Sequence, residues 1–235
     1  MALVDHEDTW RHAFGDQDTQ YLERHKRLLT AYVNERVRHL NLKVVDLSED
    51  LRDGTILWNL FEVLSKSSFA ALGGRLNKGS MKIHHLDNVN FLWRECISKS
   101  VPMKGTIGPE DIVNGNLKLT LALIFSTMIF FTTKALDMES SLMALKAKLL
   151  EWISIGLPTD RRPTNLTSDL VDGKVLLHLV ARLQPEFSSS GPGGDAAANR
   201  RAAIGAAEAI FGVPAYVDPG DPDAFLDEIT MVHTE

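Results

Sequence analysis

Apolar side chains recur along much of this chain at the three- and four-residue spacing of amphipathic helices. The clearest run follows Gly54, where Leu57, Leu60, Phe61 and Leu64 fall on one helical face. We predict six further helices, over residues 21–39, 85–98, 117–131, 142–155, 195–211 and 223–234. Patterns typical of strands are nearly absent, so the sequence predicts an all-α protein.

The segment 117–131 is the most apolar of these helices and invites comparison with a membrane span. It is 15 residues long and includes Lys118, Thr120, Ser126 and Thr127. A span needs ~20 predominantly apolar residues. We therefore expect a buried core helix.

The chain also repeats itself. Residues 48–65 align with residues 167–184 at an offset of 119, with seven identities in 18 positions. The identical pairs are Asp50/Asp169, Leu51/Leu170, Asp53/Asp172, Gly54/Gly173, Leu57/Leu176, Leu60/Leu179 and Leu64/Leu183. Upstream, residues 32–34 match residues 152–154 at an offset of 120. Two segments at nearly one offset indicate two copies of one fold, each of about 110 residues.

Each copy joins a turn to a core helix. We expect Ser48 and Thr167 to cap a short first turn. Asp53 and Asp172 then lie where a carboxylate accepts hydrogen bonds from the open amides of the following helix. The glycine after each aspartate lets the chain turn at little steric cost.

The polar stretch 132–141 separates the two copies. We predict an acidic extension over residues 1–20, a first domain over residues 21–133 and a second over residues 142–235. The extension has five acidic residues and no apolar run, so we expect no secretory signal peptide there.

The two copies differ in charge. Residues 21–139 hold 16 Lys and Arg against 13 Asp and Glu, whereas residues 140–235 hold 8 against 13. The basic residues of the first copy cluster at Arg24, Lys26, Arg27, Arg36, Arg38 and Lys43, and again at Arg75, Lys78 and Lys82. Such a surface suits an acidic partner, and the acidic second copy could also dock against the basic first one.

Motifs of enzymes and metal centres are absent from the sequence. It has no GxGxxG, P-loop or HExxH pattern, and the single Cys96 excludes a thiolate cluster within one chain and favours a reducing compartment. Asp218, Asp221 and Asp223 resemble a calcium loop only superficially, because prolines interrupt them and no closing glutamate follows. We predict no enzymatic activity, no cofactor and no metal.

Six segments carry a family resemblance. In the first copy they are DLSEDLRDGTILWNLFEVLS (46–65), LDNVNFL (86–92) and IGPEDIVNGNLKLTLALIF (107–125), and in the second LLEWI (149–153), NLTSDLVDGKVLLHLV (165–180) and GVPAYVDPGDPD (212–223). Together they resemble a tandem pair of calponin-homology domains joined by a short linker, the actin-binding region of filamins, α-actinins, spectrins and dystrophins. The resemblance covers about residues 20–235 and implies a compact helical bundle in each domain.

The resemblance implies a non-enzymatic actin-filament-binding module, the N-terminal part of a larger crosslinking or anchoring protein of the cytoplasm and cytoskeleton. The first domain is expected to make the main filament contact, and the second to regulate or stabilise it. The expected contact residues are Arg24, Lys26, Arg27, Leu29 and Tyr32 in the first helix, Arg75, Lys78 and Lys82 in a second strip, and Asn114, Asn116, Lys118, Leu119 and Leu123 in the last long helix and its lead-in.

Other partners follow from the same resemblance. Phosphoinositide is a further candidate partner, whereas no nucleic acid and no transmembrane segment are expected. The family pattern usually runs a few residues past Glu235, so we expect this chain to be a piece of a longer protein whose other parts supply oligomerisation.

One alternative stays open at this point. Leu29 and Tyr32 stand where the family pattern often has Phe and Trp. A chain with this altered first helix could instead be a calponin-homology scaffold or signalling adaptor, or a microtubule binder, with little actin affinity.

Overall fold

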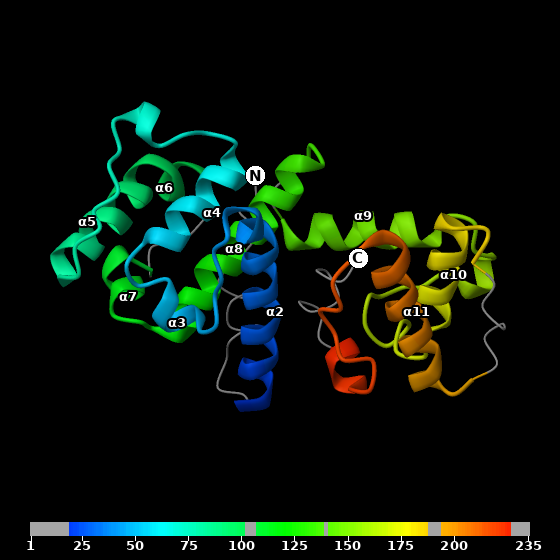
Figure 1. Cartoon of the computed structure of the whole chain (residues 1–235). Helices are drawn as coiled ribbons and strands as arrows, with labels where there is room; N and C mark the ends of the chain where they lie inside the picture. The colour runs from blue at the N-terminus through cyan, green and yellow to red at the C-terminus, as the bar shows by residue number, and fades with distance from the viewer. Residues whose placement is uncertain (1–18, 102–106, 139–140, 188–193, 227–235) are drawn as a thin grey trace. The chain divides into compact units, whose positions relative to one another are not determined.

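The computed structural model describes residues 19–101, 107–138, 141–187 and 194–226. Within these ranges every regular element is a helix, as the sequence predicts. The chain divides into two compact units, Met1–Ser141 and Leu142–Glu235 (Figure 1).

The first unit is built from one long helix at each end with shorter helices between. Its helices are α2 (Thr19–Val37), α3 (Leu47–Asp50), α4 (Thr55–Ser65), α5 (Lys82–Leu92), α6 (Ser98–Ser100), α7 (Pro109–Val113) and α8 (Leu117–Ala135). Short 3-10 turns cover Arg38–Leu40 and Ala70–Leu72, and a π-helical turn, Trp93–Ile97, joins α5 to α6.

The second unit has three longer helices in its described part. They are α9 (Leu142–Ser154), α10 (Lys174–Leu183) and α11 (Ala196–Phe211), with 3-10 turns at Thr159–Arg161 and Pro222–Leu226. The helix predicted over residues 223–234 corresponds to the second of these turns, and its remainder lies outside the described residues.

The core of the first unit forms around α8. Every residue from Thr120 to Ile129 is buried, and the helix packs against α2, α3 and α7. By length and composition alone α8 could cross a membrane, but 67% of its apolar window is buried inside the protein. The prediction of a buried core helix is confirmed.

The two repeated turns adopt the same backbone conformation. Gly54 and Gly173 precede α4 and α10 with φ of +78° and +73°, in the left-handed region that glycine tolerates best. The Asp53 carboxylate accepts from the Thr55 N–H at 2.7 Å, and Asp172 accepts from the Lys174 N–H at 2.9 Å. The predicted roles of the aspartates and glycines are therefore confirmed.

The capping of the preceding turns differs from the prediction. Asp46, not Ser48, caps α3, since its side chain accepts from the backbone N–H groups of Ser48 and Glu49. In the second unit Asn165 takes this place, accepting from the Thr167 N–H at 3.0 Å. Both caps lie two residues before the predicted ones.

A buried asparagine from a later helix holds each Asp-Gly turn. Asn88 on α5 donates to the Asp53 carbonyl at 2.7 Å and the Asn77 carbonyl at 2.9 Å, and accepts from the Asn77 N–H at 2.7 Å. Asn199 on α11 donates to the Asp172 carbonyl at 3.1 Å. Each Asp-Gly turn must lie close to the helix that carries the asparagine in order to accept these hydrogen bonds. Only glycine, which has no side chain, leaves enough space between turn and helix.

Two arginines hold the second unit together. Arg182 on α10 donates to the carbonyls of Trp152 and Ile155 at 2.8 and 2.7 Å, which satisfies the end of α9. The buried Arg200 donates to the carbonyls of Val171 and Pro219 at 2.6 and 2.9 Å.

We expect alanine at either repeated glycine to destabilise the protein by about 2–4 kcal/mol. A Cβ at Gly54 would lie 2.8 Å from the Asn88 Cβ, and one at Gly173 would lie 2.6 Å from the backbone nitrogen of Arg200. Gly173→Ala should cost more, because backbone yields less than a side chain. Denaturant unfolding followed by circular dichroism measures the loss.

Gly212→Ala is the matched control. Gly212 has a φ of +67°, but no heavy atom lies within 4 Å of the position its Cβ would take. It should lose only about 1 kcal/mol from backbone strain. An equal loss of stability at all three glycines would show that the close approach of α5 and α11 to the Asp-Gly turns does not matter.

Candidate functional site

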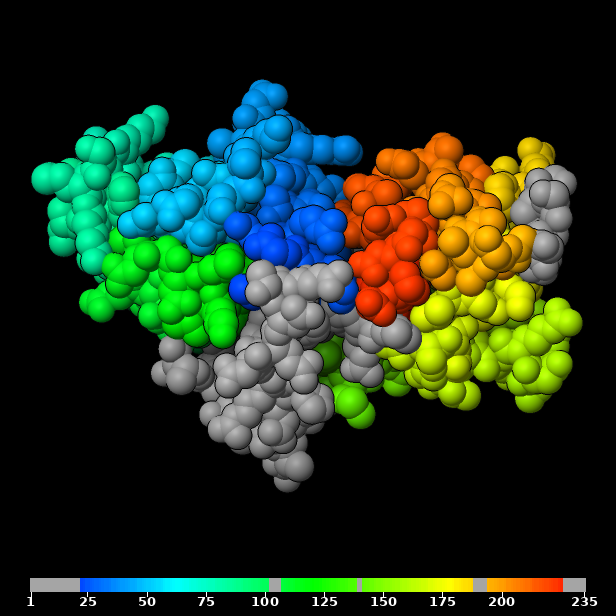
Figure 2. Space-filling model, turned by 90° about the horizontal axis from the view of Figure 1, so that it is seen from below, coloured from blue at the N-terminus to red at the C-terminus, as the bar shows by residue number. Residues whose placement is uncertain are grey.

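The three segments expected to contact a partner meet in the first unit around the short helix α3. The helix α3 packs against α8, and α5 packs against α7. Figure 2 shows the α3–α4 region (cyan), α5 (teal) and α7 with the lead-in to α8 (green) adjoining on one face of this unit. Three polar links hold this arrangement.

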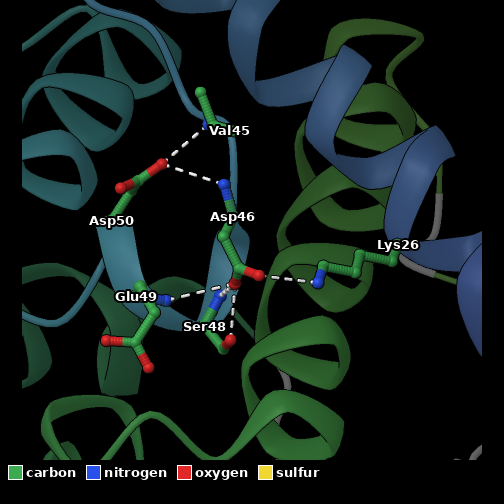
Figure 3. A network of polar contacts seen from close by, with 6 residues as sticks. All are labelled: Lys26, Val45, Asp46, Ser48, Glu49 and Asp50. Atoms are coloured by element: carbon green, nitrogen blue, oxygen red, sulfur yellow. Dashed lines mark hydrogen bonds and ion pairs between the residues drawn. The ribbon is translucent and has the colours of Figure 1, made fainter.

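The first link joins α2 to α3. The Lys26 Nζ lies 2.7 Å from Oδ2 of Asp46, in an ion pair whose side chains are 22% and 37% exposed. The other oxygen of Asp46 accepts from the Ser48 N–H at 2.8 Å and from the Ser48 hydroxyl at 2.5 Å (Figure 3). Asp50 stabilises the same turn by accepting from the N–H groups of Val45 and Asp46 at 2.6 and 2.9 Å.

This network shifts the pKa of both partners. The hydrogen bonds from Lys26 and Ser48 lower the pKa of Asp46 from 3.8 to about 2. The bond to Asp46 raises the pKa of Lys26. The pair is therefore charged on both sides across the physiological range.

The second link joins α3 to the corner before α8. The Arg52 Nη1 lies 2.8 Å from Oε2 of Glu49, and its Nε donates to the Val113 carbonyl at 3.0 Å. Gly115, with a φ of +73°, lets this corner approach α3, since a Cβ there would lie 3.1 Å from the Ser48 carbonyl oxygen. The corner is thus fixed relative to α3.

The third link joins α5 to the same corner. The Lys82 Nζ donates to the Asn114 Oδ1 at 2.6 Å. Two residues later, Asn116 caps α8 by accepting from the Leu119 N–H at 3.2 Å. Two segments that are 32 residues apart in sequence therefore present their polar side chains together.

The loop that carries Arg75 and Lys78 is anchored at both ends. At its start, Phe69 packs edge-on to Trp58 with ring centroids 5.4 Å apart, and its N–H donates to Glu62 at 2.6 Å. At its end, Asn88 binds Asn77 through the two hydrogen bonds described above. Arg75 is exposed between these anchors, and the exposed Lys78 directly follows the second one.

Most of the expected contact residues are accessible. Arg27, Arg75, Lys78, Lys82, Asn114, Asn116 and Lys118 are exposed, and Arg24, Lys26 and Leu119 are partly buried. Three expectations are wrong: Leu29 and Leu123 are 0% exposed and Tyr32 is 1% exposed. These three side chains belong to the core faces of α2 and α8, so they support the site from within and cannot contact a partner.

Sequence reasoning missed Asp46 and Arg52, the two residues that join the segments. Asp46 carried a recognisable signal, because an aspartate followed three residues later by a glutamate is a common start of a helix. Arg52 carried none, since its carbonyl partner lies 61 residues away in the sequence. In the part of the chain that the structure describes, no group of three or more His, Cys, Asp or Glu side chains could hold a metal ion.

Comparison with known proteins places this geometry in context. The model of the calponin homology (CH) domain family matches residues 23–132 and again residues 143–223. Alpha-actinin-1 of Mus musculus is 28% identical over 208 residues, which cover 87% of this chain and 22% of that protein. The sarcomeric alpha-actinin of Drosophila melanogaster is 27% identical over 228 residues, covering 94% and 23%. The chain therefore spans less than a quarter of these relatives.

A solved structure shows the same fold. The actin-crosslinking core of Schizosaccharomyces pombe fimbrin superimposes with a TM-score of 0.67 at 19% identity, covering 94% of this chain and 48% of that one. The tandem arrangement inferred from the internal repeat is thus confirmed by the two family matches and by this likeness.

We expect two substitutions of Asp46 to separate its ion pair with Lys26 from its capping of α3. Asp46→Asn keeps an oxygen that can cap α3 but loses the ion pair, so it should cost at most about 1 kcal/mol at neutral pH for this partly exposed pair. Asp46→Ala loses both and should cost about 1 kcal/mol more. Equal losses would mean that the cap contributes nothing.

The pH dependence gives an independent check of the ion pair. Because the pKa of Asp46 in the folded chain is depressed to about 2, the ionised carboxylate stabilises the fold above its ordinary pKa of 3.8. This contribution is lost as the pH falls from 3.8 towards about 2. The stability difference between the wild-type chain and Asp46→Asn should shrink over that interval, and a constant difference would contradict the depressed pKa.

Proposed function

Since this chain belongs to the calponin homology family and carries two domains of it in tandem, we propose that it binds the side of the actin filament through its first unit. The names of its relatives point the same way, because they are alpha-actinins and the core of a fimbrin that crosslinks actin. The second unit would stabilise or regulate the contact. We propose no enzymatic role.

One observation carries this proposal: the three expected contact segments form a single surface. The Lys26–Asp46, Arg52–Val113 and Lys82–Asn114 links connect them through α3 and the corner before α8. We call this surface the basic face and define it by its exposed members Arg27, Arg75, Lys78, Lys82, Asn114, Asn116 and Lys118. Five of its seven members are cationic.

The charge of this face suits an acidic polymer such as the actin filament. Cations grouped on one surface steer an acidic partner into place and raise the association rate, an effect that salt weakens. The second unit cannot serve equally well, because residues 140–235 hold more acidic than basic residues. Three of its eight basic residues, Arg162, Arg182 and Arg200, bond to carbonyls of the same unit.

The relatives are far longer than this chain, so the wider role of the whole protein is also a proposal. We infer that the tandem pair anchors a larger crosslinking or anchoring protein to filaments in the cytoplasm. Parts outside this chain would join one filament to another.

Co-sedimentation with filamentous actin tests the proposal. The wild-type chain should pellet with filaments, and its affinity should fall as salt rises, since the Debye length shrinks from ~10 Å at 0.1 M to ~3 Å at 1 M. Arg27→Glu, Lys78→Glu and Lys118→Glu should each weaken pelleting about fivefold or more, because each reverses an exposed charge of the basic face.

Lys148→Glu is the matched control, since Lys148 is an exposed lysine on α9 of the second unit. It should leave affinity unchanged, and all variants should keep the helical circular-dichroism signal. Pelleting with microtubules but not with actin would favour the alternative of a microtubule binder. Equal losses from all four variants would remove the basic face from the site.

A further inference from the structure

The basic face lacks the apolar anchor that a stable interface requires. Exposed ion pairs add little affinity each, whereas a few apolar or aromatic side chains buried at the centre usually dominate binding. Of the two apolar residues of α8 expected in this role, Leu123 is fully buried and Leu119 is only partly accessible.

Two large apolar side chains do protrude beside the basic face. Met81 is 60% exposed and Ile83 is 56% exposed, and they flank Lys82, whose ammonium bonds to Asn114. Met81 is the residue just before α5, and Ile83 lies in the first turn of that helix. Two large exposed apolar side chains thus lie directly beside a cation of the face.

The backbone that carries them is fixed in place. The Met81 carbonyl accepts from the N–H groups of His84 and His85 at 2.9 and 3.3 Å, which sets the first turn of α5. The Lys82–Asn114 bond holds that turn against the corner before α8. A backbone turn fixed in this way need not be ordered on binding, so the cost of association is limited to fixing the side chains themselves.

Charged side chains surround Met81 and Ile83 and limit the area that a partner can contact. Lys78 precedes the pair in the anchored loop, Lys82 lies between its two members, and the exposed Asp87 follows Ile83 by one helical turn. An acidic partner would be attracted on the lysine side and repelled beyond Asp87. The favourable contact area therefore extends from Ile83 towards Asn114 and the basic face, and ends at Asp87.

We propose that Met81 and Ile83 are the apolar anchors of the filament contact and enter an apolar depression of the actin filament whose rim is acidic. This inference rests on the proposed function. The continuity of the pair with the basic face through Lys82 and Asn114 selects the filament as the occupant.

Co-sedimentation of Met81→Ser, Ile83→Ser and the double variant tests the inference. Each single variant should bind filaments about tenfold more weakly, and the double variant about a hundredfold. The salt dependence of the remaining affinity should match the wild type, because no charge is removed, whereas Lys78→Ala should reduce that dependence. Met81→Leu should retain wild-type affinity.

Ile155→Ser is the matched control, since Ile155 is 57% exposed and belongs to the second unit. This substitution should leave the affinity for filaments unchanged. Thermal melts should be similar for all variants, because the substituted side chains lie at the surface. Wild-type affinity of the double variant, together with weakened binding of Lys78→Glu, would overturn the inference and leave the proposed function standing. No pelleting of the wild-type chain would overturn both.

A vesicle assay separates the filament from a lipid surface. Vesicles of phosphatidylcholine with about one-fifth phosphatidylserine should bind the wild type and the double variant equally weakly. If the double variant lost vesicle binding while its filament affinity stayed at the wild-type value, the pair would dock on membranes and the inference would be wrong.

Discussion

The buried amide of Asn88 is the interaction on which the geometry of the first unit depends. Its three hydrogen bonds tie α5 both to the Asp-Gly turn before α4 and to the loop that displays Arg75 and Lys78. A polar group buried to this extent must be satisfied, so turn, loop and helix are constrained together. Gly54 follows from this constraint, because a side chain there would push Asn88 away. The second unit repeats the arrangement with Asn199 and Gly173.

The residue that follows each clamping asparagine shows how one fold yields two different units. In the first unit it is Val89, a fully buried core residue. In the second it is Arg200, also buried, whose guanidinium bonds to two carbonyls and lies 5.2 Å from the centre of the Phe225 ring. The second unit therefore has a buried arginine that holds its segments at the position where the first unit has a core valine.

The sequence was sufficient for features that depend on local chemistry. The Asp-Gly turns, the helical class and the buried α8 follow from residue spacing and backbone preference, and the structure has them all. Features that depend on contacts between distant segments could not be predicted from the sequence. Asn88 and Asn199 are 111 residues apart, which hides them from a repeat with an offset of 119, and Arg52 bonds to a carbonyl that no pattern marks. Leu29, Tyr32 and Leu123 were misplaced because the family resemblance marks positions along the chain without showing which of their side chains the core buries. Which exposed residues touch a filament stays a prediction.

Hydrogen–deuterium exchange of the chain, free and bound to filamentous actin, tests the central claim most directly, because it maps the contact without altering any residue. If the first unit binds through the face assembled around α3, exchange in the complex should slow over residues 75–83 and 114–119, while α10 and α11 keep the rates of the free chain. Slowed exchange confined to α10 and α11, with unchanged rates over residues 75–83 and 114–119, would contradict the account.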